Sequence, residues 1–506
     1  MVGPSVISQG LQLPLPMLVN LFGALAMPFI GIASERMGGK LREVWFILVS
    51  AVSLIGVYQL YTQVKATADG VLLIYSWGQA PPLSGCFEID MLGVFMAFSI
   101  AFLGLLVAIY SISYMEHETR VTEFYTLVTF MIAGMYGIVL SGDLFTLFIF
   151  WELMGLSSYV LVSYLKQNWG PIEAGFKYLI MSATAGAFLL LSMALLYGLA
   201  GTLNFALLAS SMRGNPLTPW TILLFATLIV GFGVKSAIVP MHTWLPDAHP
   251  EAPSPISALL SGVVIETGLY ALTRLLFVVF EPELFRLPIA ALAVLTMTVG
   301  NLLALLQGDL KRLLAYSSIA QIGYMLVGLS AGSVSGAQGL FLHVFNHSLM
   351  KGLAFLAAGS LIHVAHTRNI DELKGIGRAM PLTTAGLFIS FMGLGGVPAT
   401  SGFISKFMLF SSAIQSGMIW LAVIGVLNSA LSMAYYLKVI KTLISDPLDS
   451  VKGLKEAPRL MVGVTVVMML LVILFGVYPE PAVNFAQQAA EALVTGFNSY
   501  IGAIIG

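Results

Sequence analysis

Long runs of apolar residues, separated by short polar breaks, follow one another along almost the whole chain. Each run has the length of about 20 residues that a helix needs to cross a hydrocarbon core of about 30 Å. Both sides of each run are apolar, whereas the strands of a membrane barrel alternate in polarity. The pattern predicts an all-α polytopic membrane protein with about fourteen transmembrane helices. Their expected limits are 13–34, 43–62, 89–114, 121–141, 143–165, 172–200, 219–244, 254–280, 287–307, 311–331, 336–365, 381–414, 418–442 and 459–478.

Two of these runs contain residues that interrupt helices. The seventh carries Pro240 and Pro246, and the twelfth carries Pro398 within "MGLGGVPATSG". Proline removes a backbone donor and clashes with the preceding turn, so a broken helix is predicted at each place. Interrupted helices at matching places in two halves indicate an inverted-repeat transporter. We therefore expect two inverted five-helix repeats, residues 121–280 and residues 287–442.

The segments outside the repeats are expected to be simpler. Residues 1–120 are predicted to form three helices with an external hairpin in "ADGVLLIYSWGQAPPLSGCFEID", which is rich in Gly, Pro and aromatic residues. Residues 443–506 are predicted to form a last helix and a weakly amphipathic tail. The N-terminus lacks the charged region of a cleaved signal peptide, so the first run is interpreted as the first span.

The distribution of Lys and Arg tests the helix count, because cytoplasmic loops are richer in basic residues than external loops. With the N-terminus outside, inside loops hold sixteen of the 23 basic residues and outside loops hold three. The remaining four fall within expected spans: Lys235, Arg274, Lys351 and Lys406. We therefore expect a multi-pass protein of the plasma membrane with both termini outside.

Composition excludes several classes of protein. Hydrophobic residues make up 58% of the chain and charged residues only 9%, whereas soluble domains are roughly 25% charged. The net charge is -1 and no basic stripe occurs, so nucleic acid is not an expected partner. The single cysteine, Cys86, cannot form an internal disulfide or hold a four-cysteine iron–sulfur cluster. We expect no cofactor in this chain, and any redox cofactor belongs to partner subunits.

Ionisable residues inside the expected spans are the candidate functional residues. Such a residue at the bilayer centre costs about 2.5–3.5 kcal/mol on insertion scales, so it is rare and usually functional. The candidate proton-transfer site has seven members: Glu152, Lys235, Glu266, His343, His347, Lys351 and Lys406. The two histidines and Lys351 recur at intervals of four, which places them on one face of one helix. One such residue alone could be structural, but seven indicate a route for protons.

Each of these residues also has a structural interpretation. The hydroxyls of Ser157 and Ser158 could satisfy Glu152. Lys235 could reach water or cap carbonyls that Pro240 releases, and Lys406 could anchor the unwound turn of the twelfth span. The spacing of the two histidines also occurs in metal sites, but no carboxylate or cysteine accompanies them in that helix. Titratable groups in a row suit a proton relay better, so we expect no metal.

Five stretches carry a resemblance to a known family. They are "GDLFTLFIFWELM", "VKSAIVPMHTWLPDAHPEAPSPISALLSG", "GDLKRLLAYSSIAQIGYML", "HVFNHSLMKGLAFLAAGS" and "GVPATSGFISKFMLF", spread over residues 90 to 480. The chain resembles the antiporter-like subunit family. This family is shared by the proton-pumping arm of respiratory complex I, Mrp-type Na+/H+ antiporters and archaeal membrane-bound hydrogenases. The resemblance implies fourteen helices with two inverted five-helix repeats.

The resemblance also implies roles for residues. Glu152 matches the glutamate of the family's fifth span, Lys235 the lysine of the seventh, and Lys406 the ionisable residue of the broken twelfth. His343, His347 and Lys351 match a histidine and lysine cluster found in some members. Glu266 departs from the pattern, because many relatives have lysine or histidine there. Any scheme that needs a basic group at Glu266 is therefore in doubt for this chain.

The leading hypothesis is a proton-translocating membrane subunit, with Na+/H+ antiport as a variant, in a multisubunit respiratory-type complex. By the resemblance, its partners are other membrane subunits, including further antiporter-like subunits, in a hydrogenase, complex I-like or Mrp assembly. The stretch after Met241 resembles the hydrogenase and complex I branches more than the Mrp branch. No redox chemistry is expected in the chain itself. Two alternatives remain open at this point, a self-contained transporter for a small solute and a purely structural membrane subunit.

Overall fold

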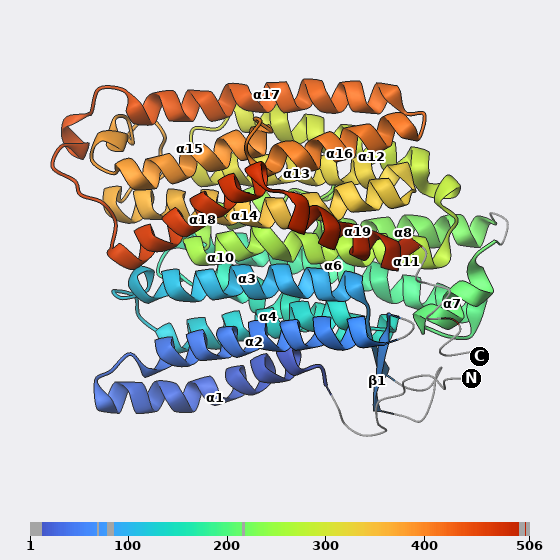
Figure 1. Cartoon of the computed structure of the whole chain (residues 1–506). Helices are drawn as coiled ribbons and strands as arrows, with labels where there is room; N and C mark the ends of the chain where they lie inside the picture. The colour runs from blue at the N-terminus through green and yellow to red at the C-terminus, as the bar shows by residue number, and fades with distance from the viewer. Residues whose placement is uncertain (1–12, 68–69, 78–84, 215–217, 495–500, 502–506) are drawn as a thin grey trace.

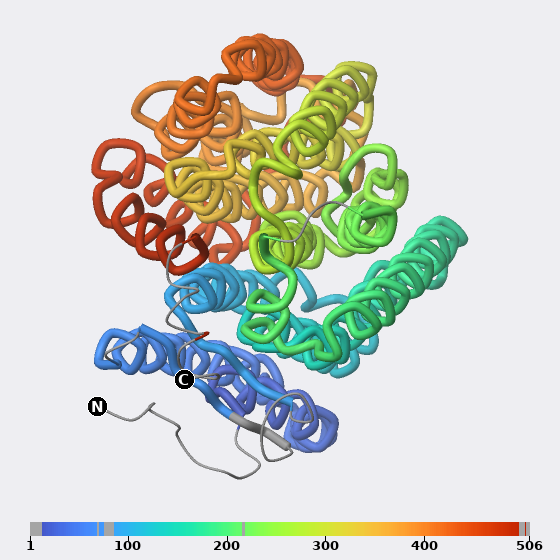
Figure 2. The backbone as a smooth tube through the Cα atoms, turned by 90° about the vertical axis from the view of Figure 1, so that its right-hand side faces the viewer, coloured from blue at the N-terminus to red at the C-terminus, as the bar shows by residue number. Residues whose placement is uncertain are grey.

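A computed structural model describes residues 13–67, 70–77, 85–214, 218–494 and 501. Long helices lie side by side and roughly parallel across the molecule, from α1 (Leu15–Met37) at one edge to α17 (Ile419–Ile444) at the other (Figure 1). The end view in Figure 2 keeps these two helices at opposite edges. The arrangement is that of a polytopic helical membrane protein, as the hydrophobic pattern predicts.

Twelve helical stretches of the described ranges are long and apolar enough to cross a membrane. Besides α1 and α17 they are α2 (Leu41–Ala66), α3 (Met91–Tyr114), α4 (Val121–Leu140), α5 (Leu144–Val162), α6 (Trp169–Ala200), α12 (Pro282–Leu305), α13 (Leu310–Ala331), α14 (Val334–Ala365) and α18 (Arg459–Val477). The twelfth is continuous from Ser254 to Val279, and comprises α10 (Ser254–Leu259), the π-helix η1 (Leu260–Val264) and α11 (Ile265–Val279).

Both predicted helix breaks are confirmed. The expected span 219–244 consists of α8 (Pro219–Lys235), which stops before Pro240, and the chain becomes helical again only in α9 (Leu245–Glu251). The expected span 381–414 consists of α15 (Pro381–Gly395) and α16 (Ser401–Gln415). Gly396 follows α15 with a left-handed φ of 82°, which glycine adopts at little cost, and Pro398 stands before α16.

The smaller elements lie around these helices. β1 (Leu72–Trp77) and β2 (Gly85–Ile89) pair antiparallel, which confirms the predicted hairpin, although its predicted loop at 78–84 lies outside the described residues. α7 (Phe205–Met212) follows α6, and short 3-10 turns form η2 (Ile376–Arg378) and η3 (Asp449–Val451). α19 (Glu480–Val494) begins the predicted amphipathic tail and packs an alanine-rich face against α3 and α14.

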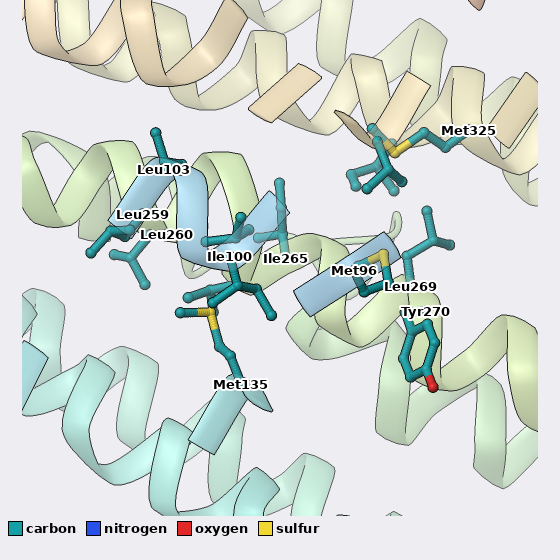
Figure 3. Packing of buried hydrophobic residues seen from close by; sticks show 14 of the residues in the cluster. Met96, Ile100, Leu103, Met135, Leu259, Leu260, Ile265, Leu269, Tyr270 and Met325 are labelled. Carbon is teal, nitrogen blue, oxygen red and sulfur yellow. The ribbon is translucent and has the colours of Figure 1, made fainter. Parts of the chain in front are cut away.

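The innermost stretch is the one that runs from α10 through α11, where every residue of the apolar window is buried. Leu259, Leu260, Ile265 and Leu269 of this stretch meet apolar side chains of α3, α4 and α13, as Figure 3 shows. A helix that is apolar on all sides is stable only when it is surrounded. Glu266 follows Ile265 directly in this stretch and is fully buried.

Candidate functional site

Lys235 is the last residue of α8 and is 2% exposed. Its Nζ donates a hydrogen bond of 3.0 Å to the hydroxyl of Tyr178 on α6, and lies 4.8 Å from the centre of that ring and 5.7 Å from the Trp151 ring. Tyr178 stacks on Trp244 with ring centres 3.9 Å apart. The carbonyl of Val234 at the helix end accepts from Trp244 Nε1 over 2.7 Å. Aromatic rings and one hydroxyl therefore hold Lys235, and it does not cap the helix end.

Glu152 lies in the middle of α5 on an exposed face. No ion pair among the described residues joins it to Lys235. Its Oε1 lies 2.9 Å from the position that a Cβ on Gly186 of α6 would take. Lys235 Nζ lies 3.5 Å from the position that a Cβ on Gly155 would take, and Gly155 is one turn after Glu152 on α5. Both charged groups therefore border the same part of α5 without forming a pair.

The structural interpretation of Glu152 is not supported. Ser157 donates its hydroxyl to the carbonyl of Leu153 over 2.9 Å, and Ser158 donates to the carbonyl of Gly155 over 2.8 Å. These back-bonds within one helix are common for serine, and they leave neither hydroxyl proton for the carboxylate. Glu152 is thus a carboxylate on an apolar, exposed helix face.

Glu266 is the second residue of α11 and directly follows the turn of π-helix η1. Its Oε1 lies 2.6 Å from Nδ1 of His347 on α14, and both residues are fully buried. The other atoms of the pair, Glu266 Oε2 and His347 Nε2, have no hydrogen-bond partner among the described residues. A π-helical turn often marks a functional position, because it changes which residues face a neighbouring helix. Here Glu266, two residues after the end of the turn, faces α14.

His343 is one turn before His347, with ring centres 6.2 Å apart. Its Nδ1 lies 2.8 Å from the Ser405 hydroxyl of α16, and its Nε2 lies 3.0 Å from Oε1 of Gln321 on α13. Gln321 Nε2 donates to the carbonyl of Leu394, near the end of α15, over 3.0 Å. The amide of Gln321 therefore links the histidine to the break between α15 and α16.

Lys406 reaches the same carbonyl from the other side. Its Nζ donates to the carbonyl of Leu394 over 2.6 Å and to the Ser429 hydroxyl over 2.9 Å, and lies 4.3 Å from the centre of the Tyr324 ring. These bonds fit the structural interpretation, in which Lys406 anchors the unwound turn, and the proton-transfer role of Lys406 stays a prediction. The shared carbonyl also brings Lys406 into one hydrogen-bonded group with Gln321 and His343.

Lys351, one turn after His347, points to a different set of partners. Its Nζ donates to the carbonyl of Leu314 over 2.9 Å and to the hydroxyl of Ser317 over 2.7 Å. Ser317 is hydrogen-bonded to the hydroxyl of Tyr436 on α17. Lys351 is thus fully buried and bonded only to neutral groups on α13.

The seven predicted residues therefore fall into separate groups. Glu266 pairs with His347, and His343 connects to Lys406 through Gln321. His343 and His347, one turn apart on α14, bring these two groups next to each other. Lys235 lies at the end of α8, which packs against α11, but no hydrogen bond of the described residues joins it to Glu266.

Arg274, which the sequence also places within a span, belongs to a buried ion cluster. Its guanidinium pairs with Glu88 over 2.7 Å and with Asp90 over 3.0 Å, and all three residues are at most 5% exposed. The cluster ties β2 and the start of α3 to α11. Burial raises the pKa of Glu88 to about 7, although the Arg274 guanidinium acts in the opposite direction.

Sequence reasoning missed several polar residues that contact the site. Gln321 and Tyr178 are neutral, so the search for ionisable residues passed over them. Lys311 was counted as an inside-loop cation, but it is 4% exposed and its Nζ donates to the carbonyl of Ala252 over 2.5 Å. His249 of α9 is fully buried and stacks on Phe355, and neither ring nitrogen has a partner among the described residues.

His343 and His347 have one carboxylate nearby, that of Glu266. In the part of the chain that the structure describes, no group of three or more His, Cys, Asp or Glu side chains is arranged to hold a metal ion. His343 and His347 bond to a hydroxyl, an amide and a carboxylate, as given above.

The arrangement of helices and the sequence both match known proteins. Residues 141–432, more than half of the chain, match the family model described as "NADH:quinone oxidoreductase/Mrp antiporter, TM". The chain belongs to this family. A second family model, "NADH-Ubiquinone oxidoreductase (complex I), chain 5 N-terminus", matches residues 81–125, which include β2 and all of α3.

Relatives within the NADH:quinone oxidoreductase/Mrp antiporter family cover most of the chain. F(420)H(2) dehydrogenase subunit N of Methanosarcina mazei is 35% identical over 422 residues, which are 80% of this chain and 85% of that protein. NADH-quinone oxidoreductase subunit N of Trichlorobacter lovleyi is 36% identical over 439 residues, which are 84% of this chain and 88% of that protein.

Solved structures agree with the family assignment. A chain of the membrane-bound sulfane sulfur reductase, an archaeal respiratory membrane complex, is 28% identical and superposes with a TM-score of 0.88 over 97% of this chain and 99% of its own. A chain of the Mrp complex from Dietzia sp. is 24% identical with a TM-score of 0.86, over 98% of this chain and 100% of its own. The latter likeness shows a shared fold.

Within this family, Glu266 was expected to be a departure. The structure provides a physical account of it, because an acid at this position lies against the imidazole of His347. The pair contains both an acidic and a basic group. A basic group is therefore present beside position 266, although it is supplied by α14.

Proposed function

We propose that the chain is a proton-translocating membrane subunit of a multisubunit respiratory-type complex, with no redox chemistry of its own. The observation that carries the proposal is the buried row that begins with the Glu266–His347 pair and continues through His343 and Gln321 to Lys406. Buried titratable groups that are connected by hydrogen bonds or by bridging water are what proton transfer requires.

Proton exchange starts at the Glu266–His347 pair. Oε1 and Nδ1 share one hydrogen bond, while Oε2 and Nε2 have no partner among the described residues. When Glu266, with its carboxyl proton on Oε1, takes a second proton at Oε2, Oε1 passes its proton to Nδ1 of His347, and His347 releases the proton of its Nε2. The number of protons on the pair is unchanged, and one proton has crossed it. The reverse sequence moves a proton the other way.

The next step connects His347 to Lys406. The rings of His343 and His347 are 6.2 Å apart between centres, and water is the natural bridge across such a gap. A His343 protonated by this route repels the ammonium of Lys406 through the small group built on Gln321 and the carbonyl of Leu394. Lys406 then releases its proton at the α15–α16 break, and the proton of His343 passes through water to the neutral amine of Lys406, which returns both residues to their starting state.

Lys235 supplies protons to the row from the other repeat. In its observed position, the ammonium bonds the Tyr178 hydroxyl and lies apart from Glu152. Movement of the Lys235 ammonium between the Glu152 carboxylate and the Tyr178 hydroxyl changes which groups lie within reach of its proton. Water between α8 and α11 then carries the proton from Lys235 to Glu266. The ammonium group of Lys351, one turn after His347 on α14, adds a positive charge beside the row.

The finer topology belongs to the same proposal. With the interrupted pairs α8–α9 and α15–α16 counted as one crossing each, the chain crosses the membrane fourteen times. Residues 121–280 and 287–442 then form two inverted repeats of five crossings, and the interrupted crossing is the fourth in each. Residues 1–120 and 443–506 flank the two repeats. Both termini lie on the outer side of the plasma membrane.

The partners follow from the family. Relatives are subunits of an F(420)H(2) dehydrogenase and of NADH-quinone oxidoreductases, and a similar fold occurs in a sulfane sulfur reductase complex. We infer that this chain likewise assembles with other membrane subunits in a redox-driven complex. Cofactors and electron transfer then reside in partner subunits, and protons are the transported ion.

Reconstitution of the complex in liposomes tests the proposal. Proton uptake per turnover is measured with a pH-sensitive dye for wild type, Lys235→Ala and Glu266→Gln. Each substitution removes a titratable group from the route, so we expect at least about a tenfold loss of coupled proton movement. Electron transfer in the presence of an uncoupler reports whether the complex is intact.

The matched control is Lys438→Ala, because Lys438 is an exposed lysine near the end of α17. It should pump like wild type. Near wild-type proton uptake in an assembled Lys235→Ala or Glu266→Gln complex would refute the relay and favour a structural subunit. Solute uptake by the chain without its partners would instead support a self-contained transporter.

A further inference from the structure

A groove of about 580 Å³ lies between α1, α4 and the end of α5, away from the proposed proton route. α1 lies at one edge of the molecule (Figure 1) and packs against α4. This volume is within the range of roughly 300–1,000 Å³ that is usual for small-molecule sites. The groove therefore has room for a ligand or part of one.

The lining of the groove changes along its length. Its inner part is apolar, with Pro28 and Ile32 from α1, Leu127 from α4 and Val160 from α5. On α1, the charged residue Glu35 follows Pro28 by seven residues, or about 10 Å of helix. Such a change from apolar to charged over about 10 Å matches the passage from hydrocarbon to headgroup region in a bilayer.

The outer end of the groove carries charges of both signs. Its lining includes Arg120, Glu123 and Glu35, together with the hydroxyl-bearing residues Thr122 and Thr126. Arg120 Nε lies 3.4 Å from Glu123 Oε1, and both side chains are about half exposed. Arg42 Nη1 lies 3.8 Å from Glu35 Oε1 and 3.4 Å from the hydroxyl of Thr122. One cation and two carboxylates thus line the mouth, with a second cation behind.

We propose that this groove binds a phospholipid with a primary ammonium in its headgroup. The phosphate of such a lipid bonds the guanidinium of Arg120 and the hydroxyl of Thr122. Its ammonium lies between Glu35 and Glu123, and one acyl chain follows the apolar part over Ile32 and Leu127. The proposal is independent of the proton route, because none of these residues belongs to it.

The charges of the mouth select this kind of headgroup. The lining residues sum to one negative charge, so a lipid with a net negative headgroup meets repulsion from the carboxylates. A zwitterionic headgroup brings no net charge and places each of its charges next to the opposite sign. A primary ammonium offers three N–H donors to the carboxylates, whereas a quaternary ammonium offers none.

Photolabelling of the purified complex tests the proposal. Three probes with the same acyl chains and a diazirine in one chain are used, with ethanolamine, choline or glycerol headgroups. Adducts are mapped by mass spectrometry. We expect the ethanolamine probe to label α1, α4 or α5 about fivefold more than either other probe. Arg120→Gln should lower this labelling about fivefold, as expected for the loss of one partly exposed charge contact.

Two further variants keep the result interpretable. Lys40→Gln removes a cation from the nearby α1–α2 turn, where Lys40 pairs with Glu116 outside the groove, and should leave labelling unchanged. Ile32→Trp fills the apolar part and should block labelling without changing the charges. Equal labelling by all three probes, no effect of Arg120→Gln, or no labelling because a partner subunit covers the groove would each overturn the proposal.

Discussion

At the scale of single residues, Glu266 and His347 act as one unit in the proposed route. A carboxyl group and an imidazole at 2.6 Å share one hydrogen bond, so the protonation of either depends on the other. Both are fully buried, and water cannot replace a lost partner without reorganisation. The pair also places a basic group, the imidazole of His347, beside the acid at position 266.

The shared proton leads to a prediction for a double-mutant cycle. Glu266→Gln and His347→Gln each remove the exchange step, so each should lower proton uptake in liposomes about tenfold or more. Because they act on one step, the double variant should pump no worse than either single variant. Losses that multiply in the double variant would mean that the two residues belong to different steps.

Glu88 provides a test by pH. Its pKa is raised from 4.5 to about 7 by burial, so the folded chain binds this proton more tightly than the unfolded chain. The stabilisation is present at acid pH and is lost as the pH rises from about 5 through 7. It amounts to a change on the order of 3 kcal/mol.

Glu88→Gln removes this titration. The melting temperature of the wild-type complex should therefore fall more steeply between pH 5.5 and 8 than that of the variant, at equal scan rates. Other buried carboxyl groups contribute equally to both proteins, so the difference isolates Glu88. Parallel curves would show that the cluster with Arg274 holds Glu88 charged at all these pH values.

The sequence could predict the ionisable members of the site, but it could not predict their partners. Charged residues stand out in an apolar span because burying them is costly. Gln321 and Tyr178 do not stand out, since neutral polar residues are common in helices, and only the tertiary arrangement brings them to His343 and Lys235. The sequence likewise does not predict that Glu152 and Lys235 lie apart without an ion pair.

At the scale of elements, helix breaks were predictable and the π-helix was not. Proline and glycine interrupt helices through local backbone geometry, so α8 and α15 stop where the sequence indicates. The π-helical turn η1 contains "LSGVV", which resembles any apolar helix segment, and it forms within a fully buried stretch. The π-helical turn changes which neighbouring helix the Glu266 side chain faces, and the spacing of apolar residues in the sequence does not predict this change.

α6 is the wall against which Glu152 lies, and this leads to a prediction. A Cβ on Gly186 would lie 2.9 Å from Glu152 Oε1, so Gly186→Ala should displace the carboxylate and leave the helix backbone in place. We expect proton uptake to fall severalfold in the reconstituted complex. The reason is that the displaced carboxylate of Glu152 would change its position relative to the ammonium of Lys235, which lies beside the same part of α5.

Gly198→Ala is the matched control for this change. Gly198 belongs to the same helix, and nothing lies within 4 Å of its Cβ position. Both variants gain a helix-favouring residue, worth about 0.5–1 kcal/mol relative to glycine. Gly198→Ala should therefore be as stable as wild type or more so, with unchanged pumping. Equal pumping by Gly186→Ala would show that the position of Glu152 is not important for transport.

At the scale of the whole molecule, hydrophobic runs and positive charges predicted the helical membrane fold well. Burial of about 20 apolar residues per crossing leaves few alternatives, so span positions differ from the observed helices by a few residues only. The packing order of the helices was not predictable, because apolar faces carry little information about their neighbours. Membrane orientation, in contrast, can be measured directly.

Cysteine labelling tests the predicted orientation. Glu283→Cys lies in the first turn of α12 and Asp371→Cys in the turn after α14, and both positions are exposed. Three long helices, α12, α13 and α14, separate them, so the two positions lie on opposite sides of the membrane. The native cysteine, Cys86, is buried and adds little background. In right-side-out vesicles, a membrane-impermeant maleimide should label Glu283→Cys at once, and Asp371→Cys only after the vesicles are opened. The reverse order would place both termini inside and would refute the predicted orientation.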